Sequence, residues 1–145
     1  MLQIKNVLFN KGDFLYTIEY FDGRCVRKIA TNEEALASFD MSVKALAECL
    51  KKNLWIDDVY SCKINSIRFG KNEDSPNSIQ MSCSSGLKMM GIVTKINPCN
   101  SKKDVPEVEQ VALYNNLIEV RGEVERYING ERAQKELDFE GDVNA

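Results

Sequence analysis

The dipeptide Asp22-Gly23 constrains the fold of this 145-residue chain more than any other feature of its sequence. It stands between FLYTIEYF (residues 14–21) and RCVRKIA (residues 24–30), two segments rich in β-branched and aromatic residues. A two-residue Asp-Gly loop between such segments is the strongest local signal of a β-hairpin. Because a second turn at residues 10–13 joins LQIKNVLF to this hairpin, the N-terminal third predicts a three-stranded antiparallel meander.

A helix is expected next, over residues 31–53. Its apolar residues recur at intervals of three and four, which is the spacing of one face of an α-helix that packs on a sheet. These residues are Leu36, Phe39, Val43, Leu46 and Leu50. Thr31 and Glu34 have the spacing of a capping box at its start. An alternative is that Asp40 caps a second helix after a kink near Ser38.

The second half of the chain repeats this order. Strand-like alternation runs through residues 59–69, and its change of face near Asn65-Ser66 predicts a β-bulge. The alternation resumes over residues 78–96, and residues 107–130 follow as a second amphipathic helix. The sequence therefore predicts two β-meanders, each followed by a helix.

The expected fold class is α+β, with antiparallel strands in the order βββ-α-βββ-α and two helices packed on one face. Residues 1–132 are expected to form a single domain, with an internal pseudo-repeat of 1–55 and 56–132 as an option. Residues 133–145 form a C-terminal tail. The sequence leaves open whether the two meanders join in one sheet. Sheets of this kind commonly leave their other face to solvent, and a binding surface is expected there.

The charge and the hydropathy of the chain limit the functional classes to which it can belong. With 19 basic and 22 acidic residues, the net charge of −3 gives no overall attraction to nucleic acid. The first residues, MLQIKNVLFNKG, lack the pattern of a secretory leader, and no apolar run approaches the roughly 20 residues that span a bilayer. We therefore expect a cytoplasmic protein that does not contact a membrane.

The chain has five widely spaced cysteines, with no Cys-x-x-Cys pair and no histidine. They are Cys25, Cys49, Cys62, Cys83 and Cys99. Zinc sites draw on closely paired cysteines or on histidines, so no metal or other cofactor is expected. Cysteines in apolar strand contexts behave as small buried hydrophobic residues, which fits a reducing compartment.

The sequence offers little for catalysis, and we expect no enzyme activity. Without histidine there is no Ser-His or Cys-His pair, and no glycine-rich phosphate loop occurs. The paired carboxylates Asp57-Asp58 and Glu107/Glu109 lie beside expected element starts, where acidic residues favour helix dipoles or face water. The segment SCSSG, residues 82–86, lacks the strand-turn-helix context of a nucleophile elbow.

Trp55 is the only tryptophan, and it follows directly on the first expected helix. The favoured interpretation is that Leu54, Trp55 and Ile56 form an apolar plug that closes the core. The alternative is that Trp55 is exposed and serves as an anchor for a protein partner, because tryptophan is enriched among interface hot spots.

Two other classes of function stay open. A nucleic-acid-binding module would use Arg24, Arg27, Lys28, Lys63 and Arg68, with tyrosines as stacking groups. Those tyrosines are Tyr16, Tyr20 and Tyr60. The cluster at residues 24–28 has a simpler explanation as a charged sheet edge. A structural subunit that oligomerises through its sheet edges is the third class.

The tail contains QKELDF, residues 134–139, which has the pattern Gln-x-x-Leu-x-Phe. It resembles the peptide by which bacterial replication and repair proteins bind the DNA sliding clamp. The resemblance implies that Gln134 is a polar anchor and that Leu137 and Phe139 enter an apolar pocket on the partner. The alternatives are that Leu137 and Phe139 pack on their own domain, as a seventh strand, or that the tail is disordered.

The longer run EVERYINGERAQKELDFEG, residues 123–141, is similar to the C-terminal ends of small accessory proteins of bacteriophages and prophages. That resemblance implies action in a bacterial cytoplasm. The function expected from the sequence is therefore that of a non-enzymatic adaptor or inhibitor, which contacts a protein of bacterial DNA metabolism or defence. Its expected partner-binding residues are Gln134, Leu137, Phe139 and, if exposed, Trp55.

Overall fold

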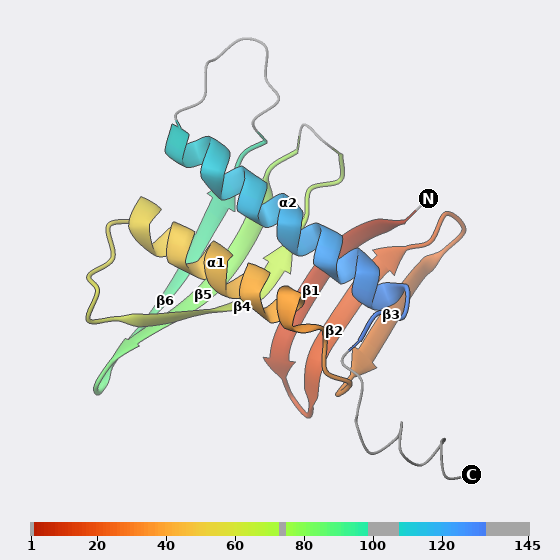
Figure 1. The fold of residues 1–145 in the computed structure, drawn as a ribbon, viewed down its shortest axis with the longest axis horizontal. Helices are drawn as coiled ribbons and strands as arrows, with labels where there is room; N and C mark the ends of the chain where they lie inside the picture. Colours follow the sequence, from red (N-terminus) through yellow and green to blue (C-terminus); the bar gives the residue numbers. More distant parts are fainter. Residues whose placement is uncertain (1, 73–74, 99–107, 133–145) are drawn as a thin grey trace.

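The computed structural model describes residues 2–72, 75–98 and 108–132, and it confirms the α+β class and the order βββ-α-βββ-α (Figure 1). The elements are β1 (Gln3–Lys11), β2 (Phe14–Phe21), β3 (Val26–Thr31), α1 (Ala37–Asn53), β4 (Ser61–Arg68), β5 (Asn77–Ser85), β6 (Lys88–Ile96) and α2 (Val108–Ile128). Neither of the two helices described is long and apolar enough to cross a membrane.

The two meanders join in a single antiparallel sheet with the strand order β3-β2-β1-β4-β5-β6. Their seam is the pairing of β1 with β4, which covers residues 6–8 opposite residues 66–68. The order is symmetric about this seam, since β1, β2 and β3 on one side correspond to β4, β5 and β6 on the other. This symmetry answers the question that the sequence left open and is consistent with the pseudo-repeat.

The Asp22-Gly23 turn joins β2 to β3 as predicted, but its loop is longer than two residues. Phe21 pairs with Val26, so four residues form the loop. Asp22 Oδ1 accepts hydrogen bonds from the backbone N–H groups of Arg24 (2.8 Å) and Cys25 (3.0 Å). The carboxylate also pairs with Arg27. Arg27 and the two amides hold the pKa of Asp22 well below its usual range.

The first helix begins later than predicted, and the capping box is wrong. α1 starts at Ala37 and has Leu36 as an N-cap without a side-chain hydrogen bond. Thr31 instead ends β3, and its hydroxyl oxygen accepts a hydrogen bond from the N–H of Glu33 at 3.1 Å. Because α1 continues through Ser38 and Asp40, the alternative of a second helix start is also wrong.

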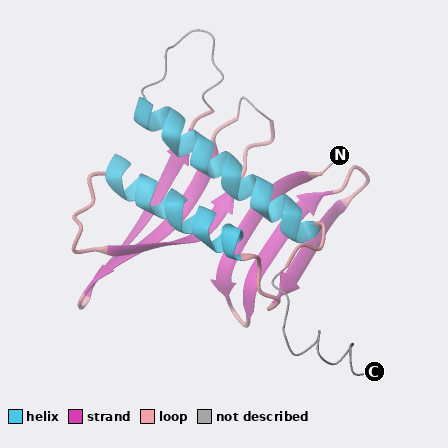
Figure 2. Ribbon diagram, viewed as in Figure 1, coloured by secondary structure: helices cyan, strands magenta, loops and turns pink. Residues whose placement is uncertain are grey.

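Both helices lie across one face of the sheet (Figure 2). The hydrophobic core fills the space between the helices and the sheet. The predicted bulge near Asn65 is confirmed by a register shift between Ile64 and Ser66. A matching shift lies between Ile4 and Asn6. These shifts keep apolar residues of β1 and β4 on the helix-covered face over their whole length.

Each half of the chain covers part of the other half. α1 packs on β4, and α2 packs on β1 as well as on β6. The two helices also pack against each other. As a result, one contiguous core contains buried residues from both halves, among them Val7, Phe39, Ile67 and Tyr127.

Candidate partner-binding loop

Trp55 lies on the surface, which contradicts the favoured prediction that it closes the core. Its side chain is 92% exposed. Leu54 is also exposed, and of the three apolar residues only Ile56 packs against the core. Trp55 has a φ of 56°, in the left-handed region that residues with a Cβ rarely adopt. The alternative interpretation, an exposed tryptophan, therefore describes the structure.

The end of α1 imposes this backbone conformation. The N–H of Trp55 donates to the carbonyl of Lys52 at 3.2 Å, and the N–H of Ile56 donates to the carbonyl of Lys51 at 3.0 Å. This pair of hydrogen bonds is a Schellman motif, in which glycine or asparagine usually holds the position of Trp55. A left-handed conformation costs a residue with a Cβ about 1–2 kcal/mol. Trp55 therefore carries a conformational cost without gaining burial.

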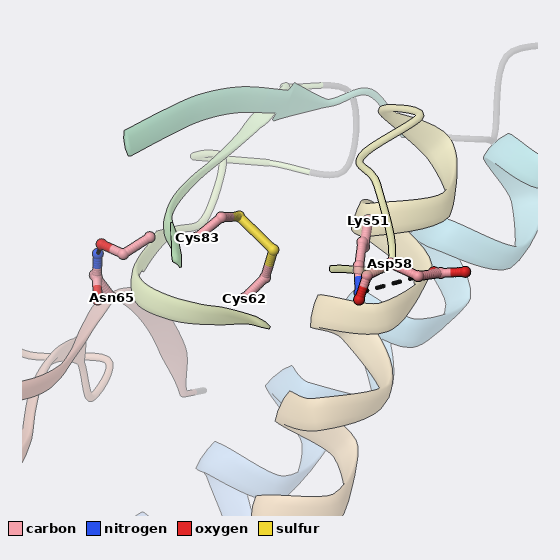
Figure 3. Close-up of a disulfide and its surroundings, with 6 residues drawn as sticks. Lys51, Asp58, Cys62, Asn65 and Cys83 are labelled. Carbon is pink, nitrogen blue, oxygen red and sulfur yellow. Dashed lines mark hydrogen bonds and ion pairs between the residues drawn. A yellow bond between two sulfur atoms is a disulfide. The ribbon is translucent and has the colours of Figure 1, made fainter. Parts of the chain in front are cut away.

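The rest of the loop is held firmly. Asp57 Oδ1 accepts a hydrogen bond from the N–H of Val59 at 3.1 Å, and its carbonyl accepts one from the N–H of Tyr60 at 3.0 Å. The buried Lys51 of α1 donates from Nζ to the carbonyl of Asp58 at 3.4 Å. Figure 3 shows Lys51 and the carboxylate of Asp58, which form an ion pair at 3.8 Å. These contacts give Asp57 and Asp58 structural roles and pre-organise the loop.

More exposed apolar side chains lie at the same end of the sheet. Val59 is 65% exposed in the loop itself, and Leu87 and Met89 are 103% and 81% exposed in the β5–β6 hairpin. The register places Ser84, the neighbour of Met89, opposite Ser61, where the loop enters β4. Figure 1 shows the α1–β4 connection and the β5–β6 hairpin at one end of the strands. We call residues 54–59 the Trp55 loop.

A disulfide joins Cys62 of β4 to Cys83 of β5, so these two cysteines are not simply the buried hydrophobic residues that the sequence predicted (Figure 3). The two residues are direct cross-strand partners, with Cα atoms 4.1 Å apart. Cys25 is exposed and Cys49 is half-buried, both outside this disulfide, and Cys99 lies outside the described residues. The inference of a reducing compartment rested on cysteines that act as buried hydrophobic residues, so the cysteines no longer support it. The pairing could not be found from spacing alone, because it depends on the register of β4 with β5.

The structure places the basic residues that were candidates for nucleic-acid binding in two different regions. Lys28, Lys63 and Arg68 alternate with buried residues and lie on the sheet face opposite the helices. Arg27 pairs with Asp22, and Arg24 lies in the turn beside it. These last two residues belong to the hairpin end rather than to the sheet face.

The three tyrosines proposed as stacking groups do not lie on that face. Tyr16 is buried and packs against Phe39, with ring centroids 5.1 Å apart. Burial raises its pKa to about 12, helped by the carboxylate of Asp40, which accepts a hydrogen bond from the phenol at 3.4 Å. Tyr20 and Tyr60 pack against the same core.

The residues of the clamp-binding resemblance, Gln134, Leu137 and Phe139, lie outside the described part of the chain. So do Glu107 and the side chain of Glu109. The preceding YINGER segment, residues 127–132, has a clear structural role.

In that segment, Tyr127 is buried, and its hydroxyl donates to the carbonyl of Glu33. The guanidinium of Arg132 lies 4.3 Å from the centre of the Tyr127 ring and pairs with the Glu33 carboxylate. The fold alone therefore explains the tyrosine and the arginine of the run that resembles phage proteins.

Within the described residues, no group of three or more histidine, cysteine, aspartate or glutamate side chains could hold a metal ion. Comparisons with known proteins found no matching family model, no similar curated protein and no similar solved structure.

Proposed function

We propose that the protein is a non-enzymatic binding protein that acts through protein–protein contact, with Trp55 as the anchor of its interface. The observation that carries this proposal is the combination of 92% exposure and a positive φ at Trp55. A residue held in a rarely populated backbone region persists where the surrounding structure over-determines it, and such residues cluster at functional sites.

The neighbourhood of Trp55 supports the proposal. Interface hot spots are enriched in tryptophan and surrounded by apolar contacts that exclude water. Val59 in the same loop and Leu87 and Met89 at the same end of the sheet are exposed apolar residues of that kind. Because Lys51 and Asp57 already fix the loop, a partner would lose little conformational entropy in binding it.

The tail refines the proposal. We place the protein in a bacterial cytoplasm, as an accessory protein of a phage or mobile element that recruits or modulates a protein of DNA metabolism or defence. The support is the resemblance of QKELDF to a clamp-binding peptide, with Gln134, Leu137 and Phe139 as its contacts. A short peptide that orders on binding gives modest affinity, which suits a transient recruiting contact.

The test is affinity capture from bacterial lysate with four forms of the protein: wild type, Trp55→Gly, Met41→Ser, and Gln134→Ala/Leu137→Ala/Phe139→Ala. Met41→Ser is the control, because it removes an apolar side chain that is 69% exposed and lies in the first two turns of α1, at the other end of that helix from Trp55. We expect Trp55→Gly to lose a specific captured protein that Met41→Ser retains. The tail variant is compared separately for binding to purified bacterial sliding clamp.

Intrinsic fluorescence gives an independent readout, because Trp55 is the only tryptophan. We expect free protein to emit like tryptophan in water and to shift to shorter wavelength when the captured partner is added. Two results together would refute Trp55 as the anchor. They are an unchanged set of captured proteins with Trp55→Gly, and no shift in the emission of the wild-type protein when the captured protein is added.

A further inference from the structure

The six strands carry eight basic residues and a single acidic one, although the whole chain has a net charge of −3. The basic residues are Lys5, Lys11, Arg27, Lys28, Lys63, Arg68, Lys88 and Lys95. The acidic residue is Glu19. The other 21 of the 22 acidic residues lie outside the ranges of these strands. The overall charge therefore hides a strongly basic sheet.

Four of these cations lie on the face opposite the helices, which we call the open face. The register places Lys28, Arg68 and Lys95 in one row across the sheet, with Glu19, Asn6 and Ser78 between them. Lys63 lies on the same face of β4, opposite Ser82. None of the four cations forms an ion pair with a described residue.

Edge protection does not explain all of these charges. Lys28 and Lys95 lie on the edge strands β3 and β6, where lysine commonly prevents sheet-to-sheet pairing. Lys63 and Arg68 lie on β4, one of the two central strands. Since neighbouring strands are about 4.8 Å apart, the row from Lys28 to Lys95 spans roughly 24 Å. The positive charge thus crosses the whole sheet.

Hydrogen-bonding side chains lie between these cations, together with the exposed apolar residues Val93 and Met89 of β6. Ser66 donates to Gln80 at 3.2 Å, and Asn65 donates to Ser82. At the seam end, an open depression of about 420 Å³ is lined by three basic residues together with polar and apolar residues. The basic residues are Lys5, Arg68 and Lys71, and among the described residues of the lining only Glu19 is acidic.

We propose that the open face binds the phosphate backbone of a nucleic acid, with the seam depression as the seat of a phosphate group. Lysine, arginine, serine, asparagine and glutamine side chains supply most contacts to phosphate and sugar in such complexes. The described residues include only two exposed aromatic side chains, Phe14 and Trp55, and neither lies on the open face. Base stacking therefore contributes little, and recognition is of the backbone rather than of sequence.

An acidic protein partner fits this face less well. Protein interfaces are built around a desolvated centre with aromatic or arginine anchors inserted into pockets. The centre of the open face instead presents Asn6, Ser66 and Gln80 around the half-buried Leu8. This surface is separate from the Trp55 loop, so the inference does not depend on the function proposed above.

The experiment is fluorescence anisotropy with labelled 20-nucleotide single-stranded and duplex DNA, over a range of salt concentrations. The variant is Lys63→Ala/Arg68→Ala/Lys95→Ala. The control, Lys44→Ala/Lys52→Ala/Lys88→Ala, removes the same charge from exposed lysines of α1 and the hairpin end. Each lost phosphate contact reduces the magnitude of the slope of log K against log salt by about 0.7 to 0.9, so we expect the loss of three contacts to reduce it by about 2 to 3.

We also expect the variant to bind at least about tenfold more weakly at low salt, and the control to bind like wild type. Trp55→Gly should bind DNA normally, which separates this inference from the function proposed for the Trp55 loop. Absence of salt-dependent binding, or an equal loss in the control, would overturn the proposal. Poly-glutamate that carries the same total charge as the DNA should not displace it from the wild-type protein. If it does, the open face binds an acidic protein and the proposal is overturned. Circular dichroism and thermal unfolding establish that both triple variants are folded.

Discussion

At the end of α1, three successive apolar residues meet different surroundings, with Trp55 in solvent and Ile56 against the core. Leu54, Trp55 and Ile56 are all apolar, and their composition does not decide which of them faces the core. The decision is made by the hydrogen bonds that end α1, which turn Trp55 outward and Ile56 inward. Apolar periodicity predicts which side chains face the core only within a helix or a strand. It therefore does not predict the orientation of a residue just beyond a helix end.

Tyr16 provides a prediction for alkaline pH. Its pKa in the folded protein is about 12, above the ordinary value of 10.0, chiefly because the phenol is buried. The unfolded chain therefore releases this proton more readily than the folded protein as pH rises. The stabilisation is complete below about pH 10 and is lost between pH 10 and 12.

Urea unfolding of wild type and Tyr16→Phe between pH 8 and 12 measures this effect. We expect the difference in stability between the two proteins to shift in favour of Tyr16→Phe above about pH 10. A constant difference across this range would show that Tyr16 does not titrate as described.

At the scale of elements, local signals predicted the strands well and the start of α1 poorly. Turn signals, β-rich composition and alternation together identified all six strands, and the change of face in β4 identified its bulge. Thr31 and Glu34 matched a capping box, but the segment before α1 is held by distant residues. Tyr127 and Arg132 bind Glu33 across more than 90 residues of sequence. Such a tertiary contact overrides a local capping signal.

The Cys62–Cys83 disulfide gives a prediction for the β4–β5 pair. Alkylation of the denatured but unreduced protein should modify Cys25 and leave Cys62 and Cys83 unmodified in peptide mass spectra. We expect Cys62→Ser/Cys83→Ser to lower the free energy of unfolding by about 2 kcal/mol, at the low end of disulfide effects because the strands are already paired. Alkylated Cys62 in unreduced wild type would contradict the bond.

At the scale of the whole molecule, the sequence predicted the order of elements but not how the halves meet. The β1–β4 seam contains three residue pairs and no connecting turn, so no local signal marks it. The basic open face was foreseen only in part, because Lys28, Lys63 and Arg68 were candidates from the sequence and Lys95 was not. The chain is acidic overall, and the register is needed to bring residues of β3, β4 and β6 onto one surface.

The shared core predicts that the halves fold together. α1 covers β4 and α2 covers β1, so neither pseudo-repeat, 1–55 or 56–132, can bury its sheet alone. We expect each fragment to be largely unfolded by circular dichroism, and the full chain to unfold in one transition by calorimetry and by urea. A fragment with its own cooperative transition would contradict this interdependence.

The central claim is that Trp55 serves a partner rather than the fold, and the unfolding free energy of Trp55→Gly tests it most directly. Glycine adopts the left-handed conformation without the cost that a Cβ imposes, and an exposed indole contributes little packing. We predict that Trp55→Gly is at least as stable as wild type, by up to about 1 kcal/mol in urea unfolding, while Trp55→Ala shows no such gain. A loss of about 3 kcal/mol or more, as expected for a core tryptophan, would contradict the account.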